Sequence, residues 1–383
     1  MDNSGTAGAD ADSILSVRVK YQSSKEFSLD VRFEASVGFT MLLGPSGSGK
    51  TTILNCIAGL IRPTSGRIAL GSRTLFDSAA RIDVPVGQRH LAYLFQTLAL
   101  FPHMTVGQNV QYGIVNLPAR ERRERIMPLL DSFHIAHLFN SRPSEISGGE
   151  RQRTALARSL VTAPELLLLD EPLSALDIAT KETILHDLRG WNKSHGIPIL
   201  YVTHSPEEAF AVGERVAVFE QGRVIATGTP QEVLRTPRQE TIAQIAGFEN
   251  LFDAVVVSLD ERQGTMLCRL GNEGHQLEVP LARAEVGASV RIAIRAGDIV
   301  IAGEHPHALS AQNTFEGRVV DITRAGVKLI VQVESGVTFE IHITPSACDE
   351  LQLIPNKRVW LVIKAYSCNL VEPRTPSLIN DNP

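Results

Sequence analysis

The sequence predicts an α/β domain followed by an all-β tail, and three observations carry that prediction. Residues 14–235 alternate short apolar runs with longer helical patterns, which is typical of α/β units on a largely parallel sheet. Four consecutive leucines at 166–169 indicate a central strand that is buried on both faces. After 236–249 the long helical patterns mostly disappear, and short β-rich runs alternate with glycine-containing turns. We therefore expect a first domain at 14–237 and a linker at 238–249.

Local patterns indicate further elements of the first domain. An apolar run at 39–43 predicts a strand. Another strand is expected at 197–203, and it ends at His204. Two further strands, 215–219 and 224–227, flank a Gln-Gly pair, which favours a hairpin turn.

The tail contains an internal repeat. The paired segments are 250–257 with 313–320 and 290–296 with 359–365. The repeat predicts two small β-barrels of related design, at 250–304 and 309–373. The alternative is that β-rich segments resemble one another by chance.

Composition is that of an ordinary globular protein. The chain has 383 residues, of which 43% are hydrophobic and 21% charged, and its net charge of −5 argues weakly against a nucleic-acid-binding surface. Residues 1–13 lack the pattern of a signal peptide and are expected to form a disordered tail. No uncharged apolar stretch reaches the roughly 18 to 20 residues that span a bilayer, so no direct membrane span is expected. The four cysteines form no metal-binding pattern, and we expect them to be reduced and packed.

A phosphate-binding loop lies between the strand at 39–43 and a helical pattern at 51–60. It matches G-x-x-x-x-G-K-[ST] through Gly44, Pro45, Ser46, Gly47, Ser48, Gly49, Lys50, Thr51 and Thr52. Glycines let backbone N–H groups converge on phosphate oxygens, and the helix N-terminus adds partial positive charge. The Lys50 ammonium is expected at the β- and γ-phosphates, and the Thr51 hydroxyl at Mg²⁺. ATP and Mg²⁺ are therefore the expected cofactors.

Two acids end the leucine strand. Side chains at the carboxyl end of such a strand reach the ligand crevice of an α/β sheet. Asp170 suits the Mg²⁺ shell, through water, and Glu171 suits polarising an attacking water. The alternative, a pair of solvated acids, is hard to reconcile with the phosphate loop.

The order of motifs resembles the ABC-transporter ATPase family. After the phosphate loop, Gln96 matches the family's Q-loop, and residues 146–150, Ile-Ser-Gly-Gly-Glu, match its signature motif. Residues 166–172 match the second nucleotide motif, Asp177 closes a D-loop match, and His204 matches the switch histidine. The resemblance implies a P-loop NTPase fold, an ABC-type nucleotide-binding domain with a helical subdomain, followed here by two OB-like barrels.

The resemblance also implies how the motifs act. Ser147, Gly148 and Gly149 begin a helical pattern and would meet ATP held by a second copy, so the site is completed in a homodimer. Gln96 would sense Mg²⁺ and the γ-phosphate, and would couple them to a permease-facing segment at 98–106. His204 would bond the γ-phosphate or the attacking water.

Three positions depart from the family pattern or leave a choice open. Glu150 replaces the usual glutamine of the signature and Ile146 the usual leucine. The charge of Glu150 suits the helix dipole but weakens phosphate attraction slightly. Tyr21 is the expected adenine-stacking aromatic, and Phe27 competes for that role.

The tail resembles the molybdate-binding Mop/TOBE domain. Residues 309–313, Leu-Ser-Ala-Gln-Asn, match its anion motif, and 362–365 match its second anion-facing segment. A tetrahedral dianion needs hydroxyl, N–H and cationic donors, and Ser310 and Lys364 could supply two of them. Gln312 stands where the family has arginine, which removes a charge and a bidentate fork.

Residues 163–178 and the signature region resemble the ATP-binding subunits of molybdate importers. That likeness implies a subunit that powers import of molybdate or tungstate from the cytoplasmic face of the bacterial inner membrane. Its expected partners are a second copy, two transmembrane permease subunits and, through them, an extracytoplasmic binding protein.

Other functions remain as alternatives. Sulfate, iron, polyamine or sugar importers share this architecture and could use the same motifs. A soluble DNA-associated ABC ATPase is more distant, because no long coiled-coil or zinc insertion separates the motifs. A cytosolic oxyanion sensor with a spent ATPase conflicts with the intact Lys50, Asp170, Glu171 and His204.

Overall fold

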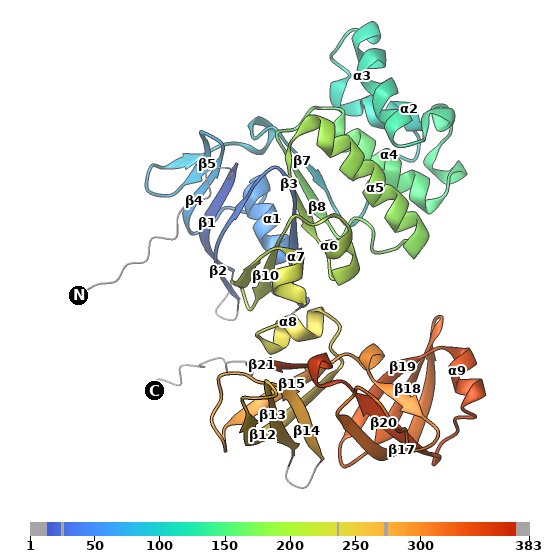
Figure 1. The fold of residues 1–383 in the computed structure, drawn as a ribbon. Coiled ribbons are helices and arrows are strands. Elements are labelled where there is room, and N and C mark those ends of the chain that lie inside the picture. Colours follow the sequence, from blue (N-terminus) through green and yellow to red (C-terminus); the bar gives the residue numbers. More distant parts are fainter. Residues whose placement is uncertain (1–13, 24–26, 236, 272–274, 373–383) are drawn as a thin grey trace. The chain divides into compact units, whose positions relative to one another are not determined.

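The computed structural model describes residues 14–23, 27–235, 237–271 and 275–372 (Figure 1). The tail expected at 1–13 lies outside these residues. The chain divides into two compact units, Met1–Val233 and Leu234–Pro383.

The first unit is built on a six-stranded sheet in the order β11-β10-β3-β9-β8-β7. The strands are β3 (Gly38–Leu43), β7 (Leu91–Leu94), β8 (Leu166–Asp170), β9 (Pro198–Val202), β10 (Arg215–Glu220) and β11 (Arg223–Gly228). Neighbours from β10 to β7 pair in parallel, and β10 and β11 form the expected antiparallel hairpin. Every residue of β3, β8 and β9 is buried, as the apolar runs predict. The parallel α/β prediction is confirmed.

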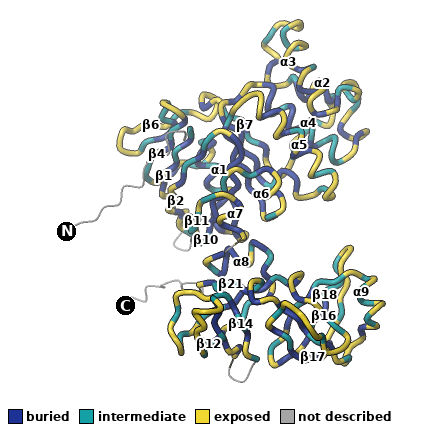
Figure 2. Tube along the Cα trace, in the orientation of Figure 1, coloured by how far each residue is buried: buried dark blue, intermediate teal, exposed yellow. Residues whose placement is uncertain are grey.

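A second, antiparallel sheet in the order β2-β1-β4-β5-β6 belongs to the same unit. Its strands are β1 (Leu15–Gln22), β2 (Ser28–Ala35), β4 (Ser65–Leu70), β5 (Arg73–Asp77) and β6 (Ile82–Asp83). Strands β1 and β2 alternate buried and exposed residues, so one face joins the core. Helix α1 (Lys50–Ala58) shares one buried cluster with both sheets, which fixes the helix that follows the phosphate loop. Figure 2 shows buried residues concentrated around α1.

Helices form the remainder of the first unit. They are α2 (Val106–Gln111), α3 (Ala119–Ser132), α4 (Gly148–Leu160), α5 (Ile178–His195) and α6 (Pro206–Val212), with short 3-10 turns at Val86–Gln88, Tyr112–Ile114, Ala136–Leu138 and Pro143–Glu145. Helices α2, α3 and α4 contact one another, and α4 also contacts β7. The three helices form the predicted helical subdomain (Figure 1). Helix α7 (Pro230–Leu234) crosses the division between the two units.

The second unit contains two five-stranded sheets. The first has the order β14-β13-β12-β15-β21 and the second β16-β20-β17-β18-β19. The strands are β12 (Asn250–Asp260), β13 (Thr265–Leu270), β14 (Gln276–Pro280), β15 (Ser289–Ile294), β16 (Val300–Ala302), β17 (Asn313–Ala325), β18 (Lys328–Glu334), β19 (Thr338–Ile343), β20 (Arg358–Ile363) and β21 (Cys368–Val371). The other elements are α8 (Glu240–Ile245), α9 (Pro345–Glu350) and 3-10 turns at Ala296–Asp298 and Ala365–Ser367. The predicted all-β tail of two related barrels is confirmed.

The two repeats exchange their last strands. Strand β16 follows the first repeat in sequence but pairs with β20 of the second, and β21 returns from the second repeat to pair with β15 of the first. Residues 300–302, assigned from sequence to the first barrel, therefore complete the sheet of the second. Antiparallel partners need not be neighbours in sequence, so the repeat alone could not reveal the exchange.

Two asparagines also join the repeats. Asn250 donates to the Glu340 carbonyl at 2.8 Å and accepts from the Glu340 N–H at 2.7 Å. Asn313, its repeat equivalent, makes the same pair of bonds with Glu278 at 2.9 and 2.7 Å. Each amide therefore satisfies the backbone of the other repeat's edge strand.

The segment expected to be a linker, 238–249, has structure of its own. Helix α8 occupies its centre and buries Glu240, Thr241, Ile242 and Ala243. Arg291 in β15 bonds both Glu240 and Asp253, and these ion pairs attach α8 to the first barrel. The segment therefore belongs to the second unit rather than to a free connection.

Candidate functional site

The phosphate loop connects β3 to α1, and its glycines have conformations that a side chain would disturb. Gly44, Gly47 and Gly49 have φ angles of 148°, 77° and 103°, in the region that favours glycine. A Cβ on Gly44 would lie 2.2 Å from the Phe219 carbonyl oxygen. Pro45, Ser46 and Gly47 form the exposed turn of the loop, whereas Ser48 and Gly49 are buried. The loop thus exposes its backbone where the motif predicts phosphate oxygens.

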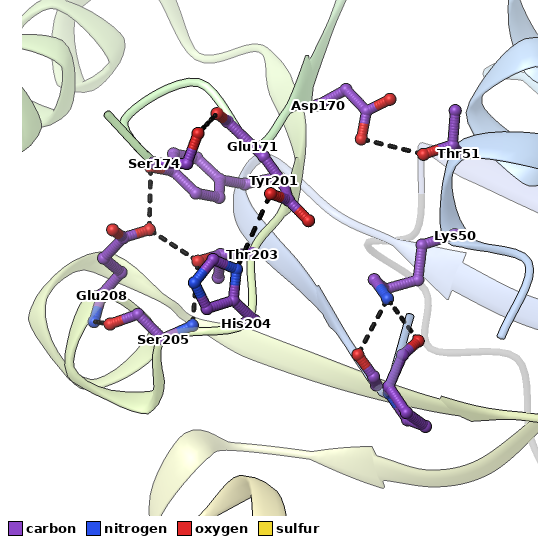
Figure 3. A network of polar contacts seen from close by, with 12 residues as sticks. Lys50, Thr51, Asp170, Glu171, Ser174, Tyr201, Thr203, His204, Ser205 and Glu208 are labelled. Carbon is purple, nitrogen blue, oxygen red and sulfur yellow. Dashed lines mark hydrogen bonds and ion pairs between the residues drawn. The ribbon is translucent and has the colours of Figure 1, made fainter. Parts of the chain in front are cut away.

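Lys50 begins α1 and folds back over this loop. Its Nζ donates to the carbonyl oxygens of Gly44 and Pro45, both at 2.8 Å (Figure 3). The side chain is 7% exposed, and burial lowers the pKa of its ammonium group. Thr51 and Thr52 follow in the first turn of the helix, exposed and half-buried. The Lys50 ammonium group is therefore already positioned at the loop where a phosphate is expected to bind.

Thr51 and Asp170 come together from different elements. The Thr51 hydroxyl on α1 lies 3.1 Å from Asp170 Oδ1 at the end of β8, and the Tyr93 hydroxyl on β7 lies 3.4 Å from Oδ2. Asp170 is 7% exposed, and burial raises the pKa of its carboxyl group. A hydroxyl and a carboxylate are hard oxygen ligands, and Mg²⁺ uses few such protein ligands beside substrate phosphates. The pair therefore fits the predicted magnesium site.

Glu171 and His204 lie side by side at the ends of β8 and β9. His204 Nδ1 is 3.7 Å from Glu171 Oε2 (Figure 3). Glu171 has a φ of 46°, a left-handed conformation that is strained for a residue with a side chain. Its N–H donates to the Val202 carbonyl at 3.0 Å, and its own carbonyl accepts from the Ser174 hydroxyl at 3.1 Å. These bonds hold the strained residue and direct its carboxylate toward the histidine.

Ser147 caps the signature helix α4. Its hydroxyl accepts from the Glu150 N–H at 3.3 Å, while its own N–H donates to the Glu150 carboxylate at 2.7 Å. In this capping box the Glu150 carboxylate turns back to the helix start, a bond that the family's usual glutamine could also accept. The hydrogen bond from the Ser147 N–H holds the pKa of Glu150 below its ordinary value.

The start of α4 lies against the D-loop. Cβ atoms on Gly148 and Gly149 would lie 3.4 Å from Leu176 Cδ2 and 2.7 Å from Thr180 Cγ2. Asp177 is exposed and caps α5, accepting from the Thr180 N–H at 3.0 Å and from its hydroxyl at 2.7 Å. Glycine at 149 therefore permits the approach of the two motifs.

Two predicted nucleotide contacts stay predictions. Gln96 is exposed, and within the described part of the chain its side chain makes no hydrogen bond to Thr51 or Asp170. Tyr21 packs partly against the core of the first unit, as does Phe27. The Phe27 ring reaches 3.5 Å from the place of a Gly49 Cβ, beside the phosphate loop. The choice between the two aromatics is therefore open.

The candidate oxyanion residues lie on the second barrel. Ser310 and Lys364 are both exposed, and among the described residues they make no hydrogen bond to each other. Lys364 precedes the 3-10 turn at Ala365–Ser367, as Arg295 precedes the turn at Ala296–Asp298. In the first repeat, Glu249 Oε2 accepts from the Ala296 N–H at 2.8 Å. The first repeat thus holds a carboxylate of its own beside its cation-bearing turn.

Sequence reasoning missed three polar residues around the site. Tyr93 contacts Asp170, Glu208 bonds Thr203, and Arg158 on α4 donates to the carbonyl oxygens of Leu98 and Ala99 at 2.7 and 2.8 Å. A polar residue in a strand or helix gives no local sign of its distant partner. The only available signals were Tyr93 in an apolar strand and Glu208 in the first turn of a helix.

No helix among the described residues has the length and apolar character needed to cross a bilayer. In the same residues, no group of three or more His, Cys, Asp or Glu side chains gathers as for a metal ion.

Comparisons with known proteins agree with this geometry. Residues 29–174 match the ABC transporter family, and residues 309–370 match the TOBE domain. The molybdenum import ATP-binding protein ModC of Paramagnetospirillum magneticum is 39% identical over 344 residues, covering 89% of this chain and 94% of the relative. The molybdate/tungstate import ATP-binding protein WtpC of Pyrococcus horikoshii is 37% identical over 363 residues, covering 93% and 99%.

A solved structure is similar in its fold. CbiO1 of Clostridium perfringens, part of the ABC transporter complex cbiONQ, superposes with a TM-score of 0.53 at 29% identity, over 62% of this chain and 96% of that one. The phosphate loop, the capped signature helix and Glu171 lie within the residues 29–174 that match the ABC transporter family. The chain therefore belongs to the ABC transporter family, as a transport ATPase subunit.

Proposed function

We propose that this chain hydrolyses ATP to power the import of molybdate or tungstate. The observation that carries the proposal is the meeting of Lys50, Thr51, Asp170, Glu171 and His204 at one edge of the sheet. The cargo is supported by the likeness to molybdenum and molybdate/tungstate import proteins over nearly the full chain.

The chemistry follows from the positions of these groups. Backbone N–H groups of the loop and the Lys50 ammonium bind the β- and γ-phosphates. Thr51 and Asp170 would hold Mg²⁺, which when bound would neutralise phosphate charge. The Glu171 carboxylate orients and polarises the attacking water, and His204, 3.7 Å away, bonds that water or the γ-phosphate.

A second copy completes the site in this proposal. The N-terminus of α4, a helix of 13 residues, presents a partial positive charge that its own phosphate loop does not need. The neighbouring D-loop is exposed, and Ile178 at the start of α5 is 76% exposed. An apolar residue of that kind beside two motifs favours burial against a partner. We infer that Ser147 and Asp177 face the nucleotide of the other copy, with Gln96 and 98–106 facing a permease.

The tail supplies an oxyanion site in the second repeat. Glu249 of the first repeat shows that the turn after the cation accepts a negative group, because its carboxylate receives the Ala296 N–H. The repeat equivalent of Glu249 is Gln312, which carries no charge. We infer that an external tetrahedral dianion takes the corresponding place beside Lys364 and Ala365, with Ser310 as a further donor.

The remaining assignments follow from the same role. The subunit would lie on the cytoplasmic face of the cell membrane and dock two permease subunits, and an extracytoplasmic binding protein would deliver the ion to them. Residues 14–237 would form the ATPase domain, and 250–304 and 309–373 the two barrels in sequence.

Two measurements test this function. In the source cell, loss of this chain should lower cellular molybdenum at low external molybdate, and the wild-type chain but not Glu171→Gln should restore it. Calorimetry of the full chain should detect molybdate or tungstate, with Lys364→Met as the variant that loses the heat. Unchanged molybdenum with reduced sulfate uptake would identify a different cargo, and absence of ATP hydrolysis would remove the function itself.

A further inference from the structure

Glu208 is a buried carboxylate next to the catalytic edge. It lies on α6, four positions after His204, and is 6% exposed. Its Oε2 accepts from the Thr203 hydroxyl at 2.7 Å and from the Tyr201 hydroxyl at 3.0 Å. The Thr203 oxygen in turn accepts from the Ser205 N–H at 3.0 Å (Figure 3). The carboxylate therefore fixes the residues on both sides of His204.

The same carboxylate reaches the helix that follows the D-loop. Its Oε1 lies 3.2 Å from the Lys181 ammonium on α5, and both side chains are mostly buried. Lys181 is one turn beyond Asp177, and its N–H donates to the Asp177 carbonyl at 3.0 Å. One side chain thus connects the start of α5 with the histidine turn.

Both oxygens of the Glu208 carboxylate have polar partners, and one of these partners is a cation. The burial of Tyr201 and the neighbouring Glu208 carboxylate raise the pKa of the tyrosine hydroxyl, which therefore stays a proton donor. Thr203 and Tyr201 donate to Oε2, and Lys181 neutralises the charge. A buried carboxylate with three polar partners restricts the positions of all of them.

We propose that Glu208 is a positioning residue for ATP hydrolysis, which holds His204 beside Glu171 and ties that placement to the D-loop through Lys181. The inference rests on the proposed ATPase function. In the nucleotide-loaded dimer, a partner that presses on the exposed D-loop would move α5, and the Lys181–Glu208 bond would carry that movement to His204.

The first test removes the ion pair between Glu208 and Lys181 while keeping the hydrogen bond between Glu208 and Thr203. In Glu208→Gln the amide oxygen still accepts from Thr203, but the charge that holds Lys181 is lost. We expect kcat for ATP to fall at least tenfold with KM changed less than twofold, because nucleotide contacts remain. Glu182→Gln removes one charge from the adjacent, exposed position on α5 and should leave both constants unchanged. Equal kcat values for Glu208→Gln and wild type would overturn the proposal.

A second test excludes a merely structural role. Lys181→Met alone leaves a buried carboxylate without its cation and should lower the melting temperature. The double variant Glu208→Gln/Lys181→Met leaves neither charge uncompensated, so its melting temperature should recover. The proposal expects kcat to stay low in that double variant, whereas a structural role expects kcat to recover with stability.

A third measurement links the effect to the histidine. Single-turnover experiments can measure the slow hydrolysis of the His204→Ala variant. In that background, adding Glu208→Gln should lower the hydrolysis rate by less than twofold. A full additional tenfold loss would mean that Glu208 acts elsewhere. If the wild-type chain hydrolyses no ATP, the proposed function fails, and that outcome is distinct from an active wild type with an indifferent Glu208.

Discussion

The Thr51 hydroxyl lies 3.1 Å from Asp170 Oδ1, although 119 positions separate the two residues. The contact exists because α1 packs over β8 within one buried cluster. It joins the phosphate loop to the strand-end acids, and it places the proposed metal between them.

Asp170→Asn should stabilise the nucleotide-free protein while abolishing Mg²⁺-dependent hydrolysis. Burial raises the pKa of Asp170, so the folded state holds its proton more tightly than the unfolded state does. Ionisation of such a group therefore lowers stability as pH rises through the window between its ordinary and its raised pKa. A neutral amide removes that penalty, and the melting temperature of the metal-free chain should rise by roughly 1 to 4 °C. Scanning calorimetry at pH 7.5 checks it, and a lower melting temperature would contradict the burial argument.

The same shift sets a pH dependence for metal. As pH falls, Asp170 takes up a proton earlier than an ordinary aspartate does, and Mg²⁺ must then compete with that proton. As pH is lowered, Mg²⁺-dependent binding of a non-hydrolysable ATP analogue should begin to weaken at a higher pH than an ordinary aspartate would produce. In Asp170→Asn the metal-dependent part should be absent throughout.

Glu171→Gln should remove hydrolysis while keeping ATP binding. The amide has the shape of the carboxylate but does not polarise water, so turnover should fall by roughly 100-fold or more. With ATP and Mg²⁺, the variant should elute as a dimer in size-exclusion chromatography. Glu182→Gln, on the exposed face of α5, is the control and should turn over normally. Persistent hydrolysis near the starting rate would show that another group orients the water.

Arg158→Met should loosen the segment after Gln96. The guanidinium holds the Leu98 and Ala99 carbonyl oxygens and lies 5.5 Å over the Phe101 ring. Loss of two charged hydrogen bonds should destabilise the first unit by about 2 kcal/mol. Hydrogen exchange should accelerate at 98–104, and Arg120→Met, whose side chain is 91% exposed, should leave that exchange unchanged. Unaltered exchange in Arg158→Met would show that the segment is held by other contacts.

Asn313→Ala should expose the edge of the first barrel. The amide satisfies both backbone groups of Glu278, and its removal leaves a half-buried donor and acceptor without their partner. Amide exchange at 276–280 should accelerate by at least about tenfold, equivalent to about 1.4 kcal/mol of local opening. Asn250→Ala should do the same at 338–343 and leave 276–280 unaffected. If both variants exchanged at the wild-type rate in both segments, the two asparagines would not protect the edge strands of the repeats.

The four thiols should react unequally with a disulfide reagent at pH 8. Burial raises the pKa of Cys268 to about 11 and those of Cys56 and Cys368 to about 12, so little thiolate is present. Cys348 is only half-buried. One equivalent should therefore react quickly, and Cys348→Ser should remove that phase. A fast phase that survives this substitution would mean that a buried cysteine opens readily.

The local motifs could be predicted because their chemistry is contained in adjacent residues. The spacing of the glycines identified the phosphate loop, whereas Ser147 and Asp177 came from the resemblance to the ABC-transporter ATPase family. All of these residues act through neighbouring backbone. The leucine run of β8 likewise predicted a strand buried on both faces. The two-repeat tail followed from self-similarity.

The tertiary structure alone decided which distant groups meet. The residues around Thr51 do not predict its contact with Asp170, and those around Lys181 do not predict its contact with Glu208. The sequence repeat likewise does not predict that β16 and β21 exchange sheets. Propensity and periodicity act over a few residues along the chain. The packing of helices on sheets and the pairing of strands act through space, so the partners of a side chain are fixed only when the core closes.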